Sequence, residues 1–323
     1  MTEDYLMERR TLLRGLAAAA VAAPAAAVLG QQQAQAAATA NYYVGTTEQT
    51  KNKVLVFPKN KAFSDANVHW SFSPGGGAWA NLSDVKFRAT EAQGWIGLMV
   101  ASGGKAGIVN IGSEKHTELN DLAWSATPGG NPHAIERVPG NGSVIVASSE
   151  GKLTVYAPSS VANLGSLAKV QTVDYAGAHG VLWDPTYELL WVVGKNRVSH
   201  YAVTGSKRNT RLKYGRHFSL GSGNLGHDLQ PDYTNRQKML LTATKGVYEL
   251  LTDGGSFRTR RISTERSVKS YVKHSSGEVV SVKGDGTQPR EWANKTVRFS
   301  ASPDRTRSGA QFYKARIWTT AFQ

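Results

Sequence analysis

Apolar and polar positions alternate in short stretches along this chain, as they do in half-buried β-strands. After residue 40, no long stretch has the spacing of an amphipathic helix. The strand-like runs come in pairs, bounded by turn-forming Gly, Asn, Asp, Lys or Pro. There are six pairs: NYYVG with KVLVF, GWIGLMVAS with GIVNI, SVIVASS with KLTVYAP, LLWVVG with RVSHYAV, MLLTAT with GVYELLT, and EVVSVK with TVRFSA. The pattern predicts an all-β chain of six similar units.

A basic residue recurs in a short segment roughly a dozen residues before each apolar pair. These residues are spaced 47, 46, 48, 42 and 45 apart, and they are Lys86, His133, His179, His227, Lys269 and Lys314. A period in this range, with four strands per unit, is typical of a β-propeller. Because the innermost strands surround one axis, equivalent positions in them form a ring. We therefore expect a six-bladed β-propeller in which six basic side chains converge at one depth of the central channel.

The two ends of the chain complete each other in this arrangement. Lys314 lies in a strand near the C-terminus that has no pair after it, while NYYVG and KVLVF near the N-terminus have no inner strand before them. Pairing the two ends closes the ring and removes exposed sheet edges. Seven blades would need about 330 residues at this period, and five would leave one basic segment unassigned. Residues 41–323 are thus predicted to form one propeller domain.

Residues 1–40 are predicted to be a twin-arginine export signal. Arg9-Arg10 is followed by an apolar, Ala-rich stretch from Leu16 to Leu29 and by the small-residue site Ala34-Gln35-Ala36. The stretch is shorter than the ~20 residues of a membrane span, and no later segment is apolar enough to span. We expect cleavage near Ala36 to Ala40 and a secreted, extracellular, monomeric protein, with a retained N-terminal anchor as the alternative.

The chain carries a net charge of +14. Residues 1–40 contain three Lys or Arg and three Asp or Glu, so the predicted mature domain keeps all of it. Such a charge attracts polyanions: acidic polysaccharide, teichoic acid, extracellular DNA or an anionic membrane surface. Solubility alone is the alternative explanation, and no dedicated nucleic-acid motif is present. The absence of cysteine excludes disulfides and thiol chemistry.

Three histidines on consecutive blades, His133, His179 and His227, are candidate ligands for one divalent metal ion, because imidazole binds Zn, Mn, Fe, Ni or Cu. A metal-free His and Lys site, or a passive channel lining, are the alternatives. The other half of the ring carries Lys269, Lys314 and Lys86. Arg88 and Arg316, two residues beyond two of these lysines, should extend the basic wall. This half is predicted to bind an anion, the alternative being lysines that extend into solvent.

Four segments carry a family resemblance: NPHAIERVP, GAHGVLWDPTYELLW, GHDLQPDY and QFYKARIW. Through them the chain resembles an uncharacterised family of exported propeller proteins over essentially the whole predicted mature domain. This resemblance implies the fold and no activity. More remotely, a histidine-rich propeller axis is similar to that of oligogalacturonate lyases, in which histidines hold a metal in the channel. That second likeness concerns architecture, which does not determine function.

The leading functional hypothesis is an enzyme that acts on an acidic glycan, in particular a polysaccharide lyase. β-Elimination from a uronate needs a neutralised carboxylate, a base for the adjacent proton and a site for the leaving oxygen. The lysines and arginines, or a bound metal, would neutralise the carboxylate. A ring histidine would be the base, with His179 as first choice and His133 and His227 beside it. The alternatives are a non-catalytic module that binds an anionic polymer or small anion, and a protein-interaction scaffold.

Overall fold

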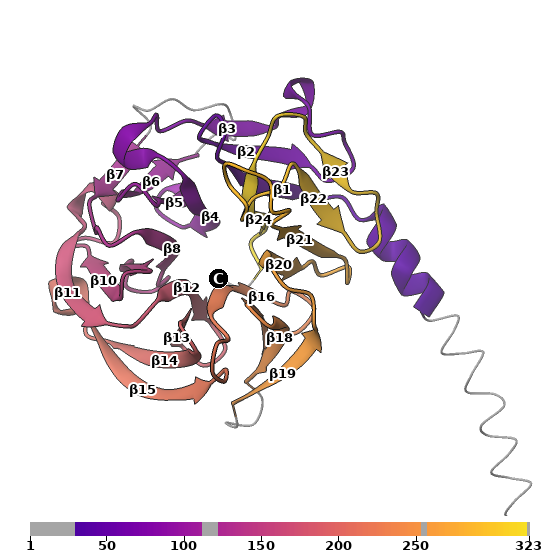
Figure 1. Cartoon of the computed structure of the whole chain (residues 1–323). Coiled ribbons are helices and arrows are strands. Elements are labelled where there is room, and N and C mark those ends of the chain that lie inside the picture. The colour runs from indigo at the N-terminus through magenta and orange to yellow at the C-terminus, as the bar shows by residue number, and fades with distance from the viewer. Residues whose placement is uncertain (1–29, 112–121, 253–256, 322–323) are drawn as a thin grey trace, which may run out of the picture.

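The computed structural model describes residues 30–111, 122–252 and 257–321. Six four-stranded antiparallel sheets stand around a central channel as the blades of a propeller (Figure 1). The predicted all-β, six-bladed architecture is confirmed. The twin-arginine motif lies outside the described residues, so export stays a prediction. Within the described ranges, no helix is both long and apolar enough to cross a membrane.

Blade one takes its innermost strand from the C-terminal end of the chain, and each other blade is one continuous segment. From the channel outward, blade one is β24 (Phe312–Trp318), β1 (Tyr43–Glu48), β2 (Lys53–Pro58) and β3 (Trp70–Phe72). Blade two is β4 (Leu82–Thr90), β5 (Gly94–Ala101), β6 (Ala106–Asn110) and β7 (Leu122–Ala126). Blade three is β8 (Pro132–Arg137), β9 (Val144–Ser148), β10 (Lys152–Ala157) and β11 (Ala168–Asp174).

The remaining blades repeat this order. Blade four is β12 (Ala178–Asp184), β13 (Leu189–Gly194), β14 (Arg197–Thr204) and β15 (Arg211–Ser219). Blade five is β16 (Gly226–Pro231), β17 (Lys238–Ala243), β18 (Gly246–Leu251) and β19 (Arg258–Ser263). Blade six is β20 (Val268–Lys273), β21 (Val279–Lys283), β22 (Thr296–Phe299) and β23 (Arg305–Thr306). Short 3₁₀ turns join some of them: η1 (Asp65–Asn67), η2 (Gly77–Trp79), η4 (Leu164–Ser166) and η5 (Lys207–Asn209).

The ring closes as predicted, by pairing of the two chain ends. Strand β1 runs antiparallel to β24, with Tyr43 opposite Trp318 and Thr46 opposite Ala315. Trp318 then stacks on Phe87 of blade two, with ring centroids 4.9 Å apart. At Gly45 a Cβ atom would lie 2.3 Å from the Phe87 ring, so only glycine permits this approach of blades one and two.

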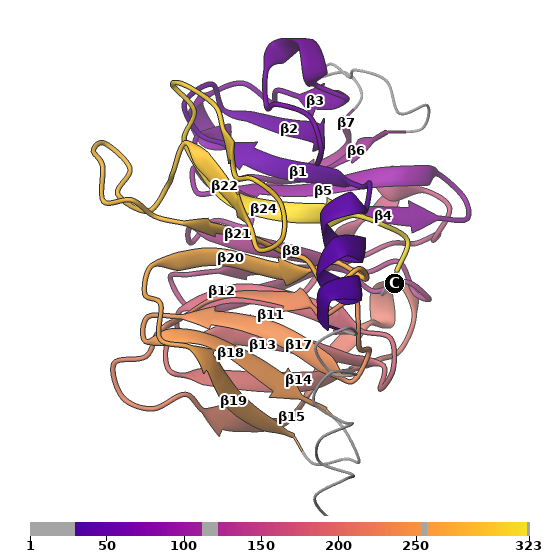
Figure 2. The ribbon, with the colours of Figure 1, turned by 90° about the vertical axis from the view of Figure 1, so that its right-hand side faces the viewer.

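A helical segment, residues 30–39, precedes the first strand (Figure 2). Ala37 is buried, and the ammonium of buried Lys59 donates hydrogen bonds to the carbonyl oxygens of Ala37, Ala38 and Ala40. The same ammonium lies 3.2 Å from a carboxylate oxygen of Glu278. The last residues of the predicted signal segment are therefore packed against the propeller in the uncleaved chain.

Removal of residues 311–323 deletes β24 and exposes the edge of β1. We expect loss of soluble protein, because closure then fails and the interblade contacts of Trp318 disappear. Expression followed by size-exclusion chromatography and circular dichroism measures this. Removal of residues 319–323 alone is the matched control and should leave the fold intact. A stably folded monomer lacking β24 would disprove closure by the chain ends.

Candidate functional site

A β-bulge recurs at the start of the innermost strand in all six blades. The pairing register with the next strand shifts at the residue before Asp84, Ala134, Gly180, Asp228 and Ser270, and again between Phe312 and Ala315. A bulge leaves one residue unpaired and redirects its side chain. The residues at these bulges are Ser83, His133, His179, His227, Lys269 and, in blade one, Tyr313 with Lys314. The repeated bulge therefore defines the pocket wall.

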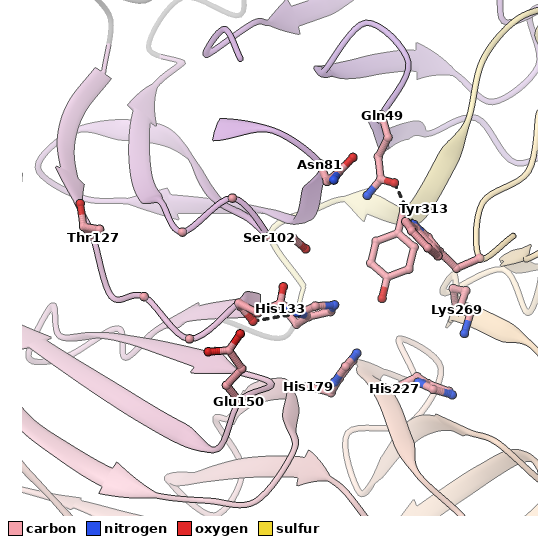
Figure 3. A pocket seen from close by; sticks show the side chains of 16 residues that line it. Gln49, Asn81, Ser102, Thr127, His133, Glu150, His179, His227, Lys269 and Tyr313 are labelled. Atoms are coloured by element: carbon pink, nitrogen blue, oxygen red, sulfur yellow. Dashed lines mark hydrogen bonds between the residues drawn. The ribbon is translucent and has the colours of Figure 1, made fainter. Parts of the chain in front are cut away.

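All of these bulge residues except Ser83 and Lys314 line a cavity of about 820 Å³ at one mouth of the channel (Figure 3). His133, His179, His227, Lys269 and Tyr313 form its floor. The rim is polar and contains amides, hydroxyls, backbone of four glycines, one carboxylate and one indole: Gln49, Asn81, Ser102, Gly103, Gly104, Thr127, Gly129, Gly130, Asn131, Glu150 and Trp292. Three predicted histidines and one predicted lysine thus come together, whereas the other predicted basic residues lie elsewhere.

The three imidazoles pack against one another. The ring centroids of His133 and His179 are 4.0 Å apart, and those of His179 and His227 are 5.6 Å apart. His133 Nδ1 lies 3.0 Å from the carbonyl oxygen of Asn131. That carbonyl only accepts, so a neutral His133 carries its proton on Nδ1 and keeps the Nε2 lone pair for the pocket. His179 and His227 form no hydrogen bond with the described residues.

All three histidines are uncharged at neutral pH. Burial, reinforced by Lys314 and Lys269, lowers the pKa of His133 to about 4. Burial and Lys269 lower the pKa of His227 to about 3. Burial and its histidine neighbours hold the pKa of His179 well below its usual value. Each imidazole is therefore in its neutral form at pH 7, the form in which a histidine can accept a proton.

Lys269 and Tyr313 complete the floor. The Lys269 ammonium forms no ion pair with any described residue, and burial followed by Lys314 lowers its pKa. The Tyr313 hydroxyl forms no hydrogen bond with the described residues, and burial raises its pKa. Figure 3 shows this hydroxyl pointing toward the histidines. A cation without a counterion thus lies beside an unpaired hydroxyl and three neutral imidazoles.

The rim is held by side chains of blade one and blade six. Trp292, in the strand-free segment 284–295 of blade six, donates from its indole N–H to Gln49 Oε1 over 2.9 Å. Gln49 in turn donates to the Leu82 carbonyl oxygen. The indole is still 41% exposed, so an aromatic face borders the pocket.

Four of the predicted anion-binding residues lie one layer deeper and are buried. Lys86 contacts Glu136 of blade three over 3.1 Å and the Val181 carbonyl oxygen of blade four. Arg88 forms two hydrogen bonds with the same Glu136, of 3.0 and 2.7 Å. These two cations are therefore occupied by a carboxylate, which corrects the expectation that they face a ligand.

Blade one supplies the other two buried cations. Lys314 lies 3.2 Å from Asp228 of blade five and donates to the His133 carbonyl oxygen over 3.1 Å. Arg316 binds Asp84 of blade two and Asp228. We call the seven residues the channel cluster: Lys86, Arg88, Lys314, Arg316, Asp84, Glu136 and Asp228. It crosses the channel directly below the pocket. Its residues come from four blades, and the contact of Lys86 with the Val181 carbonyl oxygen reaches a fifth.

The electrostatics of the channel cluster favour ionised partners. Burial alone would raise the pKa of Glu136, but Arg88 and Lys86 outweigh it and lower the pKa. Arg316 and Lys314 likewise lower the pKa of Asp228. Burial outweighs Glu136 at Lys86 and lowers the pKa of that ammonium. In formal charge, four cations face three carboxylates below the pocket floor.

The metal prediction does not agree with this geometry. Among residues 30–111, 122–252 and 257–321, no three His, Asp or Glu side chains are placed to hold a metal ion together. The three histidines instead stack edge to face or tilted, with His133 Nδ1 engaged by backbone. We therefore describe the site by its His, Lys and Tyr side chains, and the metal site stays a prediction.

Sequence reasoning missed Tyr313, although it immediately precedes Lys314 in the recognised segment QFYKARIW. It also took Lys86 rather than Ser83 as the ring position of blade two. Ser83 Oγ lies 2.7 Å from Ser102 Oγ at the pocket rim. The recurring bulge identifies both Ser83 and Tyr313, but a bulge has no distinct sequence pattern. The spacing of basic residues therefore grouped residues of the pocket floor with residues of the channel cluster below it.

The chain is thus a six-bladed β-propeller with a polar pocket at one mouth of its channel. It belongs to a protein family of unknown function, DUF6528, whose family model matches residues 13–321. The predicted resemblance to an uncharacterised propeller family is confirmed, whereas export and the likeness to oligogalacturonate lyases stay predictions.

A likeness to a solved structure supports the fold alone. The crystal structure of the WD40 β-propeller domain of Doa1 is similar with a TM-score of 0.51 and 15% identity, over 84% of this chain and 82% of that one. No curated protein matches this chain.

Substitution Glu136→Gln tests the channel cluster. It removes the carboxylate from Lys86 and Arg88 and leaves two buried cations without a counterion, which should cost about 3–5 kcal/mol of unfolding free energy. Urea unfolding measures it. Asp65→Asn, which breaks an ion pair between Arg307 and a carboxylate that is 92% exposed, is the control and should change stability little. Equal effects of the two substitutions would contradict a structural role for the cluster.

Proposed function

We propose that the pocket binds an anionic saccharide through a carboxylate group. The observation that carries this proposal is the Lys269 ammonium, which has no carboxylate partner among the described residues and lies beside three uncharged imidazoles. A partly buried cation without a counterion is costly, and a bound anion relieves that cost. The channel cluster below adds a net positive field. The ligand class agrees with the anionic partner expected from composition.

The rim supports a sugar rather than a bare inorganic anion. A saccharide needs donors and acceptors for its hydroxyls and a flat apolar surface for its ring. Gln49, Asn81 and Asn131 border the cavity as amides, and Trp292 presents an exposed indole beside them. A cavity of about 820 Å³ has room for more than one sugar ring. Oligosaccharide ends or short chain segments therefore fit better than a lone small ion.

β-Elimination is the second candidate, and the Tyr313 hydroxyl favours it. In this reaction Lys269 neutralises the uronate carboxylate, and neutral His179 removes the C5 proton. The electron pair of that C–H bond forms the C4–C5 double bond as the C4–O bond breaks. Tyr313 gives its proton to the leaving oxygen. Solvent then returns the proton from His179 to Tyr313, so atoms and charges balance and no further reactant is needed.

Export belongs to the same proposal. The twin-arginine motif and the apolar stretch after it would carry the folded propeller out of the cytoplasm. Acidic glycans are found outside the cell. Partial support comes from the composition, since a cysteine-free fold does not depend on the redox state of its compartment.

Lys269→Met should weaken the binding of galacturonate oligomers at least about tenfold, because one charge-assisted hydrogen bond is worth ~1.5–3 kcal/mol. Isothermal titration calorimetry at low salt measures the affinity. Lys61→Met, which removes an exposed lysine far from the cavity lining, is the matched control. Unchanged affinity in the Lys269 variant would refute carboxylate binding at this lysine.

The same titration has a predicted pH dependence. A bound anion raises the low pKa values of His133 and His227, so these imidazoles take up protons as the complex forms. Affinity should therefore increase as pH falls from 7 toward 5, and the His133→Gln, His227→Gln double variant should lose much of that increase. This pH dependence comes from the histidines and not from the ligand, because a uronate stays ionised between pH 7 and pH 5.

Lyase activity is measured by the ultraviolet absorbance of the unsaturated product from polygalacturonate and other polyuronides. We expect His179→Ala and Tyr313→Phe to lower kcat by about 10²-fold or more and to leave KM nearly unchanged. Tyr43→Phe, which alters an exposed tyrosine of β1 outside the cavity lining, is the control. Binding without any product from the unaltered protein would leave a non-catalytic module as the function of the pocket.

A further inference from the structure

Half of the net charge of the chain is concentrated in one sequence interval. Between Glu188 and Asp228 there is no Asp or Glu, and there are seven Lys or Arg: Lys195, Arg197, Lys207, Arg208, Arg211, Lys213 and Arg216. These seven charges equal half of the total of +14. The channel cluster explains only one of the surplus charges. Most of the net positive charge therefore lies outside the channel and needs another explanation.

The interval leads to the perimeter of the propeller. Three of its cations lie on β15, the outermost strand of blade four, and two more in the turn η5 before it. The outermost strand of blade five, β19, adds Arg258, Arg260 and Arg261. Figures 1 and 2 show β15 and β19 as neighbours on the outside of the ring. The rings of Phe218 on β15 and Phe257 just before β19 are 6.1 Å apart, which fixes this adjacency.

Several of these cations have no partner within the described part of the chain. Lys213, Arg216 and Arg261 are exposed and form no ion pair or side-chain hydrogen bond with the described residues. Arg260 is paired, with its guanidinium contacting Glu249. We call the exposed side chains of β15 and β19 the outer basic surface. It differs from the pocket, whose lining includes no residue of either strand.

Protection of sheet edges does not account for this concentration. Charged residues on an edge strand prevent pairing with other chains, and every blade has such an edge. Yet β3 and β7, the outermost strands of blades one and two, carry no Lys or Arg. Strand β11 of blade three carries one lysine and one aspartate. Strand β23 of blade six carries one arginine, Arg305, whose guanidinium donates to the carbonyl oxygens of Lys59 and Pro303. The positive charge of the outermost strands is therefore concentrated on two neighbouring blades.

An aromatic ring lies in the middle of the outer basic surface. Tyr214 is 51% exposed and lies between Lys213 and Arg216 in sequence. Its hydroxyl is 2.7 Å from His217 Nδ1, which fixes the direction of the ring. An exposed aromatic ring held in one direction, on a strand rich in cations, matches a sugar ring that bears acidic groups. Residues two apart in a strand are ~7 Å apart, so successive cations can meet successive charged sugars.

From these observations we propose that the outer basic surface binds an extended acidic polysaccharide. The site is independent of the pocket, since it lies on the perimeter and uses other residues. Single-stranded nucleic acid is less well matched, because stacking of successive bases needs several aromatic rings. Among the described residues of β15 and β19, Tyr214 is the one exposed Phe, Tyr or Trp, and His217 beside it is held by the Tyr214 hydroxyl.

The test compares two triple variants of the full chain with equal charge. Lys213→Ser, Arg216→Ser, Arg261→Ser removes the outer basic surface, and Lys51→Ser, Lys61→Ser, Lys295→Ser removes three exposed lysines elsewhere. Heparin, a sulfated uronate polymer, is the probe, and its affinity is measured from 50 to 300 mM salt. We expect the first triple to lower the slope of log affinity against log salt by about 2, from ~0.7 per lost contact. The second should change it little.

Three results would overturn the proposal. Equal losses in both triples would mean that net charge alone attracts the polymer. A loss toward vesicles containing phosphatidylserine, or toward DNA of equal charge density, with heparin binding intact, would assign the surface to another partner. Circular dichroism confirms that each triple folds. Lys269→Met removes at most one contact with heparin and should lower its salt slope by no more than ~0.7. The first triple should leave the galacturonate oligomer titration unchanged, so failure at one site is distinguishable from failure at the other.

Discussion

The ion pairs of the channel cluster are the interaction on which the rest of this structure depends. Each carboxylate of the cluster forms ion pairs with cations of a blade other than its own. These ion pairs hold the inner strands in one relative position. Glu136 is the clearest case, since it receives both Lys86 and Arg88 from the neighbouring blade. Charges of this kind are expensive to bury and much more expensive to leave unpaired. The cluster therefore fixes the alignment of the blades more than it adds to stability.

This cluster also determines what the pocket can do. Its seven side chains are buried beneath the cavity, so a ligand in the pocket lies on one side of this layer. Its positive excess, together with burial, keeps the three imidazoles neutral and leaves Lys269 as the floor cation without a partner among the described residues. An anion that enters thus meets one fixed charge and several groups able to gain or lose a proton. Binding and proton uptake are consequently linked by the arrangement itself.

The fold could be predicted from the sequence, and the layers of the channel could not. The paired apolar runs matched β2, β10 and β13 closely because burial on both faces of a blade demands continuous Val, Leu and Ile. The depth of a basic side chain depends instead on whether it precedes or follows a bulge. Tyr313 and Lys314 are neighbours in sequence, yet one lines the pocket and the other lies below it. Since both are opposite Thr47, only the backbone register separates them.

Neighbouring residues on the inner strands thus belong to different layers, one to the pocket floor and the next to the channel cluster. Because they are joined by a peptide bond, the two layers are coupled. His227 lines the pocket while Asp228 holds Lys314 and Arg316. Lys314 in turn donates to the carbonyl oxygen of His133. A substitution in the cluster will therefore shift pocket side chains through one peptide unit, without touching a ligand. Loss of ligand binding in a cluster variant is evidence about position, whereas loss in a Lys269 or Tyr313 variant that keeps its stability is evidence about contact.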